Sequence, residues 1–192
     1  MQVAMIGGHG FGRAVAKDLL DHGHEITNVI SPDPKMVDLC VDAGATEGWG
    51  RETEAEMLIS VHNHAWITQE QIDRFRYGCI GYHPSLLPLH RGKDAIRWTI
   101  HMKESVAGGT VYLLEGDEAD TGPIVFQDWC LVHPDWDASA LWRAELFPMG
   151  VRLIRKTVEY VEANDFVPAT PQDEDLATWE PAWDRPKLKE QA

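Results

Sequence analysis

Residues 83–92 carry the sequence HPSLLPLHRG and follow an apolar run, residues 77–82, that predicts a buried strand. This strand delivers the imidazole of His83 to its carboxyl end. Two prolines stiffen the loop that follows, and a helix is predicted over residues 93–102. An isolated histidine after a strand is more often structural. Ligands of open α/β sheets bind at the carboxyl ends of strands, however, so His83 is a candidate functional residue.

A carboxylate follows on a second predicted loop, within Asp120-Thr121-Gly122-Pro123. The short turn over residues 116–123 separates two strands predicted at residues 109–115 and 124–132, which indicates an antiparallel pair. A histidine and an aspartate on loops at strand ends are groups that acyl-group chemistry uses for proton transfer and charge stabilisation. We therefore predict that His83 and Asp120 form a catalytic pair.

The rest of the pattern predicts an α/β protein. Strands are expected at residues 3–6, 25–30 and 57–61, helices at residues 13–21, 35–43, 69–75 and 138–163, a loop at residues 47–54 and a kink at Phe147-Pro148. Consecutive strand–helix–strand units imply parallel strands with right-handed crossovers. The expected fold is Rossmann-like and three-layered, with a mixed, mostly parallel sheet flanked by helices in a single domain.

The chain has 192 residues, which suffices for one domain with a full core. We expect the catalytic domain to span residues 1–165. Residues 166–192 are an acidic tail rich in Trp and Pro, expected to be extended and packed through Trp179 and Trp183, or partly disordered. Three further tryptophans are candidates for a homodimer face: Trp129, Trp136 and Trp142.

The composition excludes several classes of partner. The formal net charge of −14 argues against nucleic acid, because proteins that bind it present basic surfaces. No apolar run approaches the ~20 residues of a membrane span, so no membrane partner is expected. The apolar N-terminus leads at once into glycines and predicts a first strand rather than a signal peptide. The three cysteines form no CxxC motif, which indicates a cytoplasmic location.

A glycine-rich segment, GGHGFG at residues 7–12, follows the first strand and leaves three interpretations open. A dinucleotide site is disfavoured, because the GxGxxG template that begins at Gly8 needs a glycine where Arg13 stands. The acidic residue expected after the second strand is also not clearly placed, since Asp33 lies beyond a Ser-Pro pair. An anion site at the helix N-terminus and a plain tight turn are the other two interpretations.

His62 and His64 lie two residues apart at a predicted strand end and so share one face. A metal site would need a third ligand from the remaining candidates, which are His9, His90 and Asp120. No recognised zinc spacing occurs, so the preferred interpretation is that these residues line a cleft, and no metal is expected.

Residues 81–92, GYHPSLLPLHRG, together with Asp120-Thr121-Gly122, resemble the core of the 10-formyltetrahydrofolate-dependent formyltransferases. Further matching segments are residues 6–7, 11–12, 95–99 and 146–150, and the resemblance covers residues 1–163. The family includes glycinamide ribonucleotide formyltransferase, methionyl-tRNA formyltransferase and sugar N-formyltransferases. It also includes the hydrolase domain of 10-formyltetrahydrofolate dehydrogenase, to which residues 82–85 and 146–148 are most similar.

The resemblance implies roles for individual residues. His83 corresponds to the family's catalytic histidine and Asp120 to its catalytic aspartate, which assist the attack of an amine on the formyl carbon through a tetrahedral intermediate. The implied co-substrate is 10-formyltetrahydrofolate, and the implied acceptor is a small molecule such as a nucleotide or an amino sugar. The residues implied for the folate site are His62, Asn63, Trp66, Ser85, Leu86, Leu87, Pro88, Gly116, Asp117, Glu118 and Ala119. Those implied for the acceptor site are Gly7, Gly8, His9, Gly10 and Arg91.

The chain departs from the family's pattern at Gly81, where the family places an asparagine that donates to the oxyanion. Loss of one such donor typically costs ~10²–10³ in rate, unless Asn63, His62 or His64 replaces it. Two alternatives to formyl transfer therefore stay open. One is hydrolysis of 10-formyltetrahydrofolate to tetrahydrofolate and formate, and the other is an inactive module that binds folate or a nucleotide.

A second departure concerns length. The tRNA enzyme and the hydrolase domain carry an additional C-terminal barrel domain, for which residues 166–192 are too few. Together with the acidic charge, this favours a small-molecule acceptor over tRNA.

Overall fold

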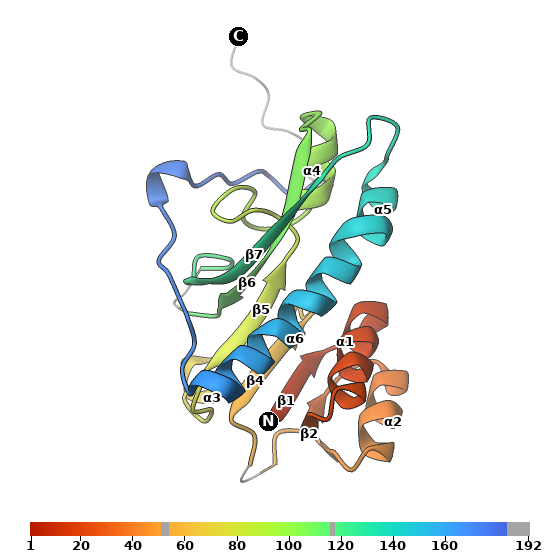
Figure 1. Ribbon diagram of the computed structural model, residues 1–192, viewed down its shortest axis with the longest axis vertical. Coiled ribbons are helices and arrows are strands. Elements are labelled where there is room, and N and C mark those ends of the chain that lie inside the picture. The colour runs from red at the N-terminus through yellow and green to blue at the C-terminus, as the bar shows by residue number, and fades with distance from the viewer. Residues whose placement is uncertain (51–53, 116–117, 184–192) are drawn as a thin grey trace.

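The computed structural model describes residues 1–50, 54–115 and 118–183, and within them the chain folds around a seven-stranded sheet (Figure 1). The strand order is β3-β2-β1-β4-β5-β6-β7. The first five strands run parallel, whereas β6 is antiparallel to β5 and β7 is antiparallel to β6. The strands are β1 (Gln2–Gly7), β2 (Glu25–Ile30), β3 (Thr46–Glu47), β4 (Met57–Val61), β5 (Cys79–His83), β6 (Val106–Leu113) and β7 (Ile124–Leu131). The predicted mixed, mostly parallel sheet is confirmed.

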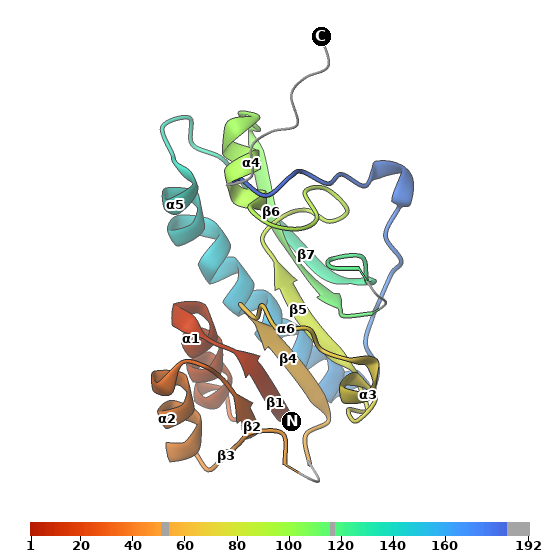
Figure 2. The ribbon, with the colours of Figure 1, turned by 180° about the vertical axis from the view of Figure 1, so that it is seen from behind.

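Helices cover both faces of this sheet. The described helices are α1 (His9–Asp21), α2 (Pro34–Asp42), α3 (Gln69–Ile72), α4 (Ala95–His101), α5 (Ala138–Leu141) and α6 (Phe147–Asn164), with a π-helical turn at Trp142–Leu146 and a 3₁₀ turn at Glu174–Leu176. α1 and α6 pack side by side on one face, as the two opposite views show (Figures 1 and 2). None of the described helices is long and apolar enough to cross a membrane.

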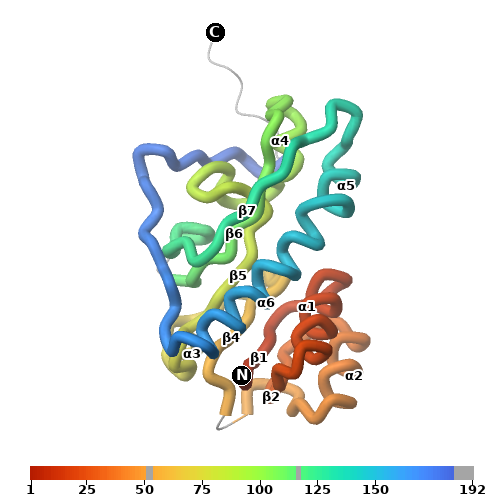
Figure 3. The backbone as a smooth tube through the Cα atoms, in the orientation of Figure 1, coloured from red at the N-terminus to blue at the C-terminus, as the bar shows by residue number. Residues whose placement is uncertain are grey.

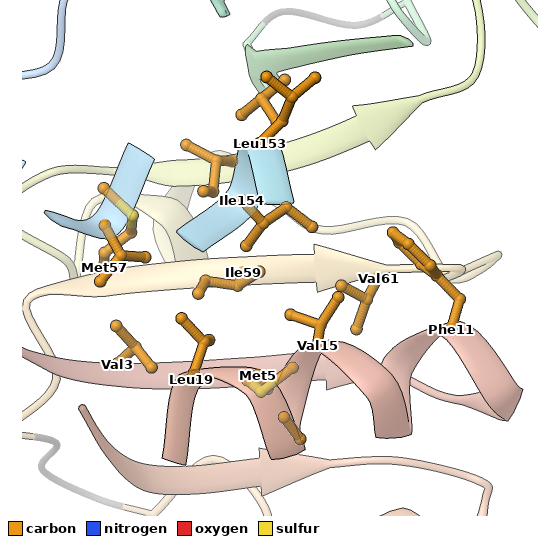
Figure 4. Close-up of a cluster of buried hydrophobic side chains, with 14 of the residues drawn as sticks. Val3, Met5, Phe11, Val15, Leu19, Met57, Ile59, Val61, Leu153 and Ile154 are labelled. Carbon is orange, nitrogen blue, oxygen red and sulfur yellow. The ribbon is translucent and has the colours of Figure 1, made fainter. Parts of the chain in front are cut away.

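The sheet buries both of its faces, because successive side chains of a strand point to opposite sides. Along β1, Val3 and Met5 enter the larger core, and Ala4 and Ile6 enter a smaller core on the other face. Figure 4 shows the larger core, where Leu19 of α1 and Ile154 of α6 lie against the strands. β1 and β4 are therefore central strands with apolar side chains on both faces, as parallel strands of α/β proteins usually are.

The predicted long helix over residues 138–163 is present, and the predicted irregularity falls close to Pro148. α5, the π-helical turn and α6 follow one another without a break, and the proline lies in the first turn of α6. Proline has no N–H and its ring crowds the preceding turn, so it fits best at the start of a helix. The π-helical turn immediately before it accommodates the change in hydrogen bonding.

Several predicted boundaries are wrong. α1 begins at His9, so residues 9–12 form its first turn rather than a loop. Residues 46–47 form the short edge strand β3, although residue 47 was predicted to begin a loop. α3 ends at Ile72, three residues before the predicted end of the helix. β6 begins earlier than predicted, at Val106, because that residue pairs with Leu131 of β7. Tertiary pairing overrides the local pattern in these places.

The chain after α6 returns across the molecule, as the blue segment of the tube in Figure 3 shows. We refer to residues 168–183 as the tail strap. Thr170 pairs with Ile124 at the start of β7, and Trp179 pairs with Arg91 in the loop after β5. The ring of Trp183 then lies 5.0 Å from that of Trp98 on α4. Trp179 and Trp183 thus both contact the folded chain, and residues 184–192 of the predicted tail lie outside the described residues.

Replacing Ile154 tests the packing of α6 on the sheet. Ile154 is fully buried between α6 and the strands, so Ile154→Ala leaves a cavity and should lower the free energy of unfolding by about 2–5 kcal/mol. Urea denaturation measures this change. The matched control is Val41→Ala on the exposed side of α2, expected to change stability by less than about 0.5 kcal/mol. Equal losses in both variants would contradict the assigned core.

Candidate active site

A cleft of about 1050 Å³ opens at the carboxyl ends of β4 and β5. Residues 62–67 after β4 form one wall, and residues 92–97 at the start of α4 form another. Glu118, Ala119 and Asp120 close the side next to β6. Phe11 and Trp142, whose ring centroids are 5.5 Å apart, add an aromatic wall. The cleft therefore lies at the edge of the sheet where α/β proteins bind ligands.

His83 ends β5 and lines this cleft with only 6% of its surface exposed. Its Nε2–H donates to the backbone carbonyl of His90 at 2.7 Å, since a carbonyl can only accept. This bond fixes the ring orientation and leaves Nδ1 as the nitrogen that can gain and lose a proton. Nδ1 lies 3.5 Å from Oδ2 of Asp120. The predicted catalytic pair is thus brought together in the cleft.

The carboxylate of Asp120 is held by two groups from different parts of the chain. Its Oδ2 accepts from the backbone N–H of Gly92 at 2.8 Å, and its Oδ1 accepts from the Tyr112 hydroxyl at 2.6 Å. Its backbone adopts the left-handed conformation with φ +61°, which is costly for a residue with a side chain and persists when the surroundings enforce it. Asp120 is therefore a rigidly placed acceptor beside His83.

The tail strap holds the two loops of the site against each other. The side-chain amide of Gln172 donates to the backbone carbonyls of Asp120 at 2.9 Å and Gly122 at 2.7 Å. Its carbonyl oxygen accepts from Arg91, which is 2% exposed and also pairs with Glu174 at 2.7 Å. The hydrogen bond and charge of Glu174 raise the pKa of Arg91 against the opposing effect of burial. Arg91 thus joins the loop after β5 to the tail strap.

The structure places the residues predicted for the folate site in two groups. Those that line the cleft with His83 and Asp120 are His62, Asn63, Trp66, Glu118 and Ala119. Those that are not among the cleft-lining residues are Ser85, Leu86, Leu87 and Pro88. Ser85 and Leu87 are buried, and the Ser85 hydroxyl donates to the carbonyl of Leu89 within its own loop. Gly116 and Asp117 lie outside the described residues.

The residues predicted for the acceptor site lie beside the cleft rather than in its lining. This applies to Gly7, Gly8, His9, Gly10 and Arg91. Gly7 serves the fold, because a Cβ there would meet the backbone carbonyl of Val61 at 1.9 Å. The ring of His9 lies 5.2 Å from that of His62, which does line the cleft. Arg91 is committed to the tail strap, as described above.

The histidines near the cleft mouth form a row of rings and not a chelating cluster. The rings of His62 and His64 lie 5.5 Å apart, and His9 continues the row. Burial, followed by repulsion from His64 and His9, lowers the pKa of His62. Across residues 1–50, 54–115 and 118–183, no three His, Cys, Asp or Glu side chains are placed to hold a metal ion.

The glycine-rich segment after β1 packs against the segment that follows β2. Asp33, the acidic residue nearest to the end of β2, forms an ion pair with Arg13 and caps α2 by accepting from the N–H of Lys35 at 3.1 Å. A Cβ on Gly8 would lie 3.1 Å from that of Asp33. The two segments therefore pack directly against each other.

The space that the side chain of the expected asparagine would take is filled by neighbouring side chains. A Cβ on Gly81 would lie 2.8 Å from Cδ1 of Leu114 and 3.3 Å from Cε1 of Tyr112. Asn63 does not present its amide as a substitute, because this amide bonds to the backbone of Ala65 within its own turn. Tyr112 and Gln172 are the site residues that sequence reasoning missed, since neither belongs to a recognisable motif.

The comparison with known proteins agrees with this geometry. The model of the formyl transferase family matches residues 42–149, which is more than half of the chain. This chain belongs to the formyl transferase family. The mitochondrial 10-formyltetrahydrofolate dehydrogenase of Mus musculus is 32% identical over 97% of the chain. The chain spans only 23% of the length of that relative.

Solved structures of formyl transferase relatives share the fold at lower identity. HypX from Aquifex aeolicus, in complex with tetrahydrofolic acid, superposes with a TM-score of 0.74 at 22% identity, over 94% of this chain and 29% of that chain. WlaRD, a sugar 3N-formyl transferase in the presence of dTDP and 5-N-formyl-THF, superposes with a TM-score of 0.76 at 16% identity, over 94% and 69%. These likenesses confirm the three-layer α/β fold.

Replacing Gly81 tests how tightly this position is packed. Gly81→Asn forces Leu114 and Tyr112 to move, so we expect a loss of about 1–3 kcal/mol in the free energy of unfolding. Urea denaturation measures it. Gly10→Asn is the matched control, because a Cβ there has only a side-chain atom of Arg13 at 4.0 Å. If the two variants lose the same stability, the space beside Gly81 is not filled as described.

Replacing Gln172 tests whether the tail strap holds the Asp120 turn. Gln172→Ala removes both hydrogen bonds to the turn that carries Asp120. The backbone N–H of Gly92 donates to Asp120, so its hydrogen should exchange with solvent roughly 10- to 100-fold faster. Hydrogen exchange followed by NMR measures this rate. Gln69→Ala removes a comparable exposed bond, to Asp73, and should leave Gly92 unchanged. Unaltered protection in Gln172→Ala would show that the strap does not fix the turn.

Proposed function

We propose that this chain transfers the formyl group of 10-formyltetrahydrofolate to the amine of a small-molecule acceptor, such as a nucleotide or an amino sugar. The observation that carries the proposal is the His83–Asp120 pair in the cleft of a formyl transferase family member. Two relatives of the same fold support the ligand class, since HypX was solved with tetrahydrofolic acid and WlaRD with 5-N-formyl-THF and dTDP. The net charge of −14 supports a small acceptor over tRNA.

In the proposed reaction the amine attacks the formyl carbon and the formyl oxygen becomes an oxyanion. Collapse of the tetrahedral intermediate forms the new amide and breaks the bond between the formyl carbon and N10 of tetrahydrofolate. One proton leaves the amine and one proton reaches N10. We assign this transfer to Nδ1 of His83, because Nε2 is committed to the His90 carbonyl. Asp120 stabilises the imidazolium while it carries the proton.

We assign the walls of the cleft to the two substrates. His62, Asn63 and Trp66 contact the pterin, and the turn that holds Glu118 and Ala119 completes the folate side. The acceptor approaches from the end of β1, next to residues 7–10, which include His9.

We further propose that the protein acts in the cytoplasm as a homodimer. The free cysteines support the cytoplasmic location. Trp129, which is 60% exposed on edge strand β7, supports a dimer interface. The other two tryptophans considered for this face, Trp136 and Trp142, pack against the core.

Hydrolysis is the second candidate, with water in place of the amine. Gly81 supports it, because the hydrolase domain that the chain resembles also lacks the asparagine at this position. The 32% identity to a 10-formyltetrahydrofolate dehydrogenase over nearly the whole chain favours it as well. The same His83–Asp120 pair would serve both reactions, so the acceptor separates them.

The deciding experiment incubates the pure protein with 10-formyltetrahydrofolate and follows the absorbance of tetrahydrofolate, first without and then with candidate amines. We expect release that His83→Gln and Asp120→Asn lower by roughly 10²–10⁴-fold. His133→Gln, at an exposed histidine outside the cleft, is the control and should leave release unchanged. Release without an amine assigns a hydrolase, and release that requires one assigns a transferase.

A protein that binds 10-formyltetrahydrofolate tightly without turning it over in either condition would be the inactive binding module. Absence of both turnover and binding would overturn the folate assignment.

A further inference from the structure

Gly81 and Tyr112 are directly opposite each other in the antiparallel pairing of β5 with β6. Side chains at such positions compete for one space on the face of the sheet. Here the ring of Tyr112 takes that space together with Leu114, since a Cβ on Gly81 would approach both closely. The glycine in β5 and the tyrosine in β6 are therefore two parts of one arrangement.

The hydroxyl of Tyr112 reaches the catalytic carboxylate. Tyr112 is 9% exposed and lines the cleft, and its hydroxyl donates to Oδ1 of Asp120 at 2.6 Å. The backbone N–H of Gly92 holds the other oxygen, Oδ2, at 2.8 Å. With one fixed donor on each oxygen, the carboxylate cannot rotate freely, and Oδ2 stays turned toward Nδ1 of His83.

Tyr112 remains a donor under all ordinary conditions. Burial, followed by the charge and the hydrogen bond of Asp120, raises the pKa of Tyr112 well above its ordinary value. The other titratable groups that face the Tyr112–Asp120 pair are His83 and Cys79 on β5, Arg91 in the loop after β5, and Glu118 in the turn before Asp120. Tyr112 therefore has no part as a base, and its hydroxyl serves to orient the carboxylate of Asp120.

We propose that Tyr112 is a positioning residue for formyl transfer, which acts through Asp120 to keep the carboxylate aligned with His83. This inference rests on the proposed function of the same site. It explains why position 81 is a glycine, because the ring that orients Asp120 occupies the space of the asparagine expected there. Charge-assisted hydrogen bonds of this kind are among the stronger interactions in proteins, so the loss of one has a measurable effect.

The test compares Tyr112→Phe with Tyr77→Phe. The second variant is a matched control, because Tyr77 also donates its hydroxyl to an aspartate, Asp165, outside the cleft. In Tyr112→Phe we expect kcat to fall roughly 10- to 100-fold with little change in KM. Tyr77→Phe should change neither.

A merely structural role of Tyr112 would lower stability and leave the kcat of the folded fraction unchanged. Urea denaturation of both variants therefore accompanies the kinetics. If the folded fraction of Tyr112→Phe retains the kcat of the unaltered protein, the proposal is wrong.

A second measurement separates this proposal from the proposed function. The chemical shift of the Asp120 carboxyl carbon, observed by ¹³C NMR, should differ from that of the unaltered protein in Tyr112→Phe and should be unchanged in the Tyr77→Phe control. This readout needs no substrate. If the unaltered protein fails to act on 10-formyltetrahydrofolate while the Asp120 signal moves in Tyr112→Phe, the proposed function is wrong. The link between the Tyr112 hydroxyl and Asp120 is then still supported. An unmoved signal would overturn the link itself.

Discussion

The antiparallel pairing of β6 against β5 is the constraint on which the site depends. It sets Thr110 opposite His83 and Tyr112 opposite Gly81, and β7 then returns beside β6. β6 ends beside the start of β5, since Leu113 pairs with Ile80, and the turn between β6 and β7 then folds back until Asp120 lies next to His83.

The hydrogen bonds around the His83–Asp120 pair come almost entirely from fixed backbone or buried groups. His83 is oriented by a carbonyl, and Asp120 by an amide and a buried phenol. Donors and acceptors that are already in place cost no reorganisation during a reaction, which is the basis of electrostatic catalysis. The ring of His90, whose carbonyl accepts from His83, is itself flanked by the carboxylates of Glu104 and Glu180. Rigidity at the site is therefore built up over successive layers of contacts.

The sequence predicted the elements whose signals are local. The apolar run of β4 and the segment of β2 have the predicted bounds, since buried parallel strands are continuous apolar stretches between turn residues. His83 and Asp120 were found because each follows a strand on a short loop. The start of α1 was misplaced because the glycines at residues 10 and 12 look like loop. Both lie in the helix, and Gly12 lets it pack closely on Met36 of α2. Tyr112 and Gln172 carry no local signal, and Gln172 meets Asp120 across 52 residues of sequence.

The tail strap also fixes when the site can be completed as the chain is synthesised. The sheet and α6 contain all the strands and helices of the larger core, so they can assemble before residues 168–183 emerge from a ribosome. The buried guanidinium of Arg91 would then lack both Gln172 and Glu174, and a buried charge without partners is strongly unfavourable. The loop after β5 is thus expected to stay open in a nascent chain and to close last. The His83–Asp120 pair precedes residue 121, yet its surroundings are complete only when residues 168–183 have been added.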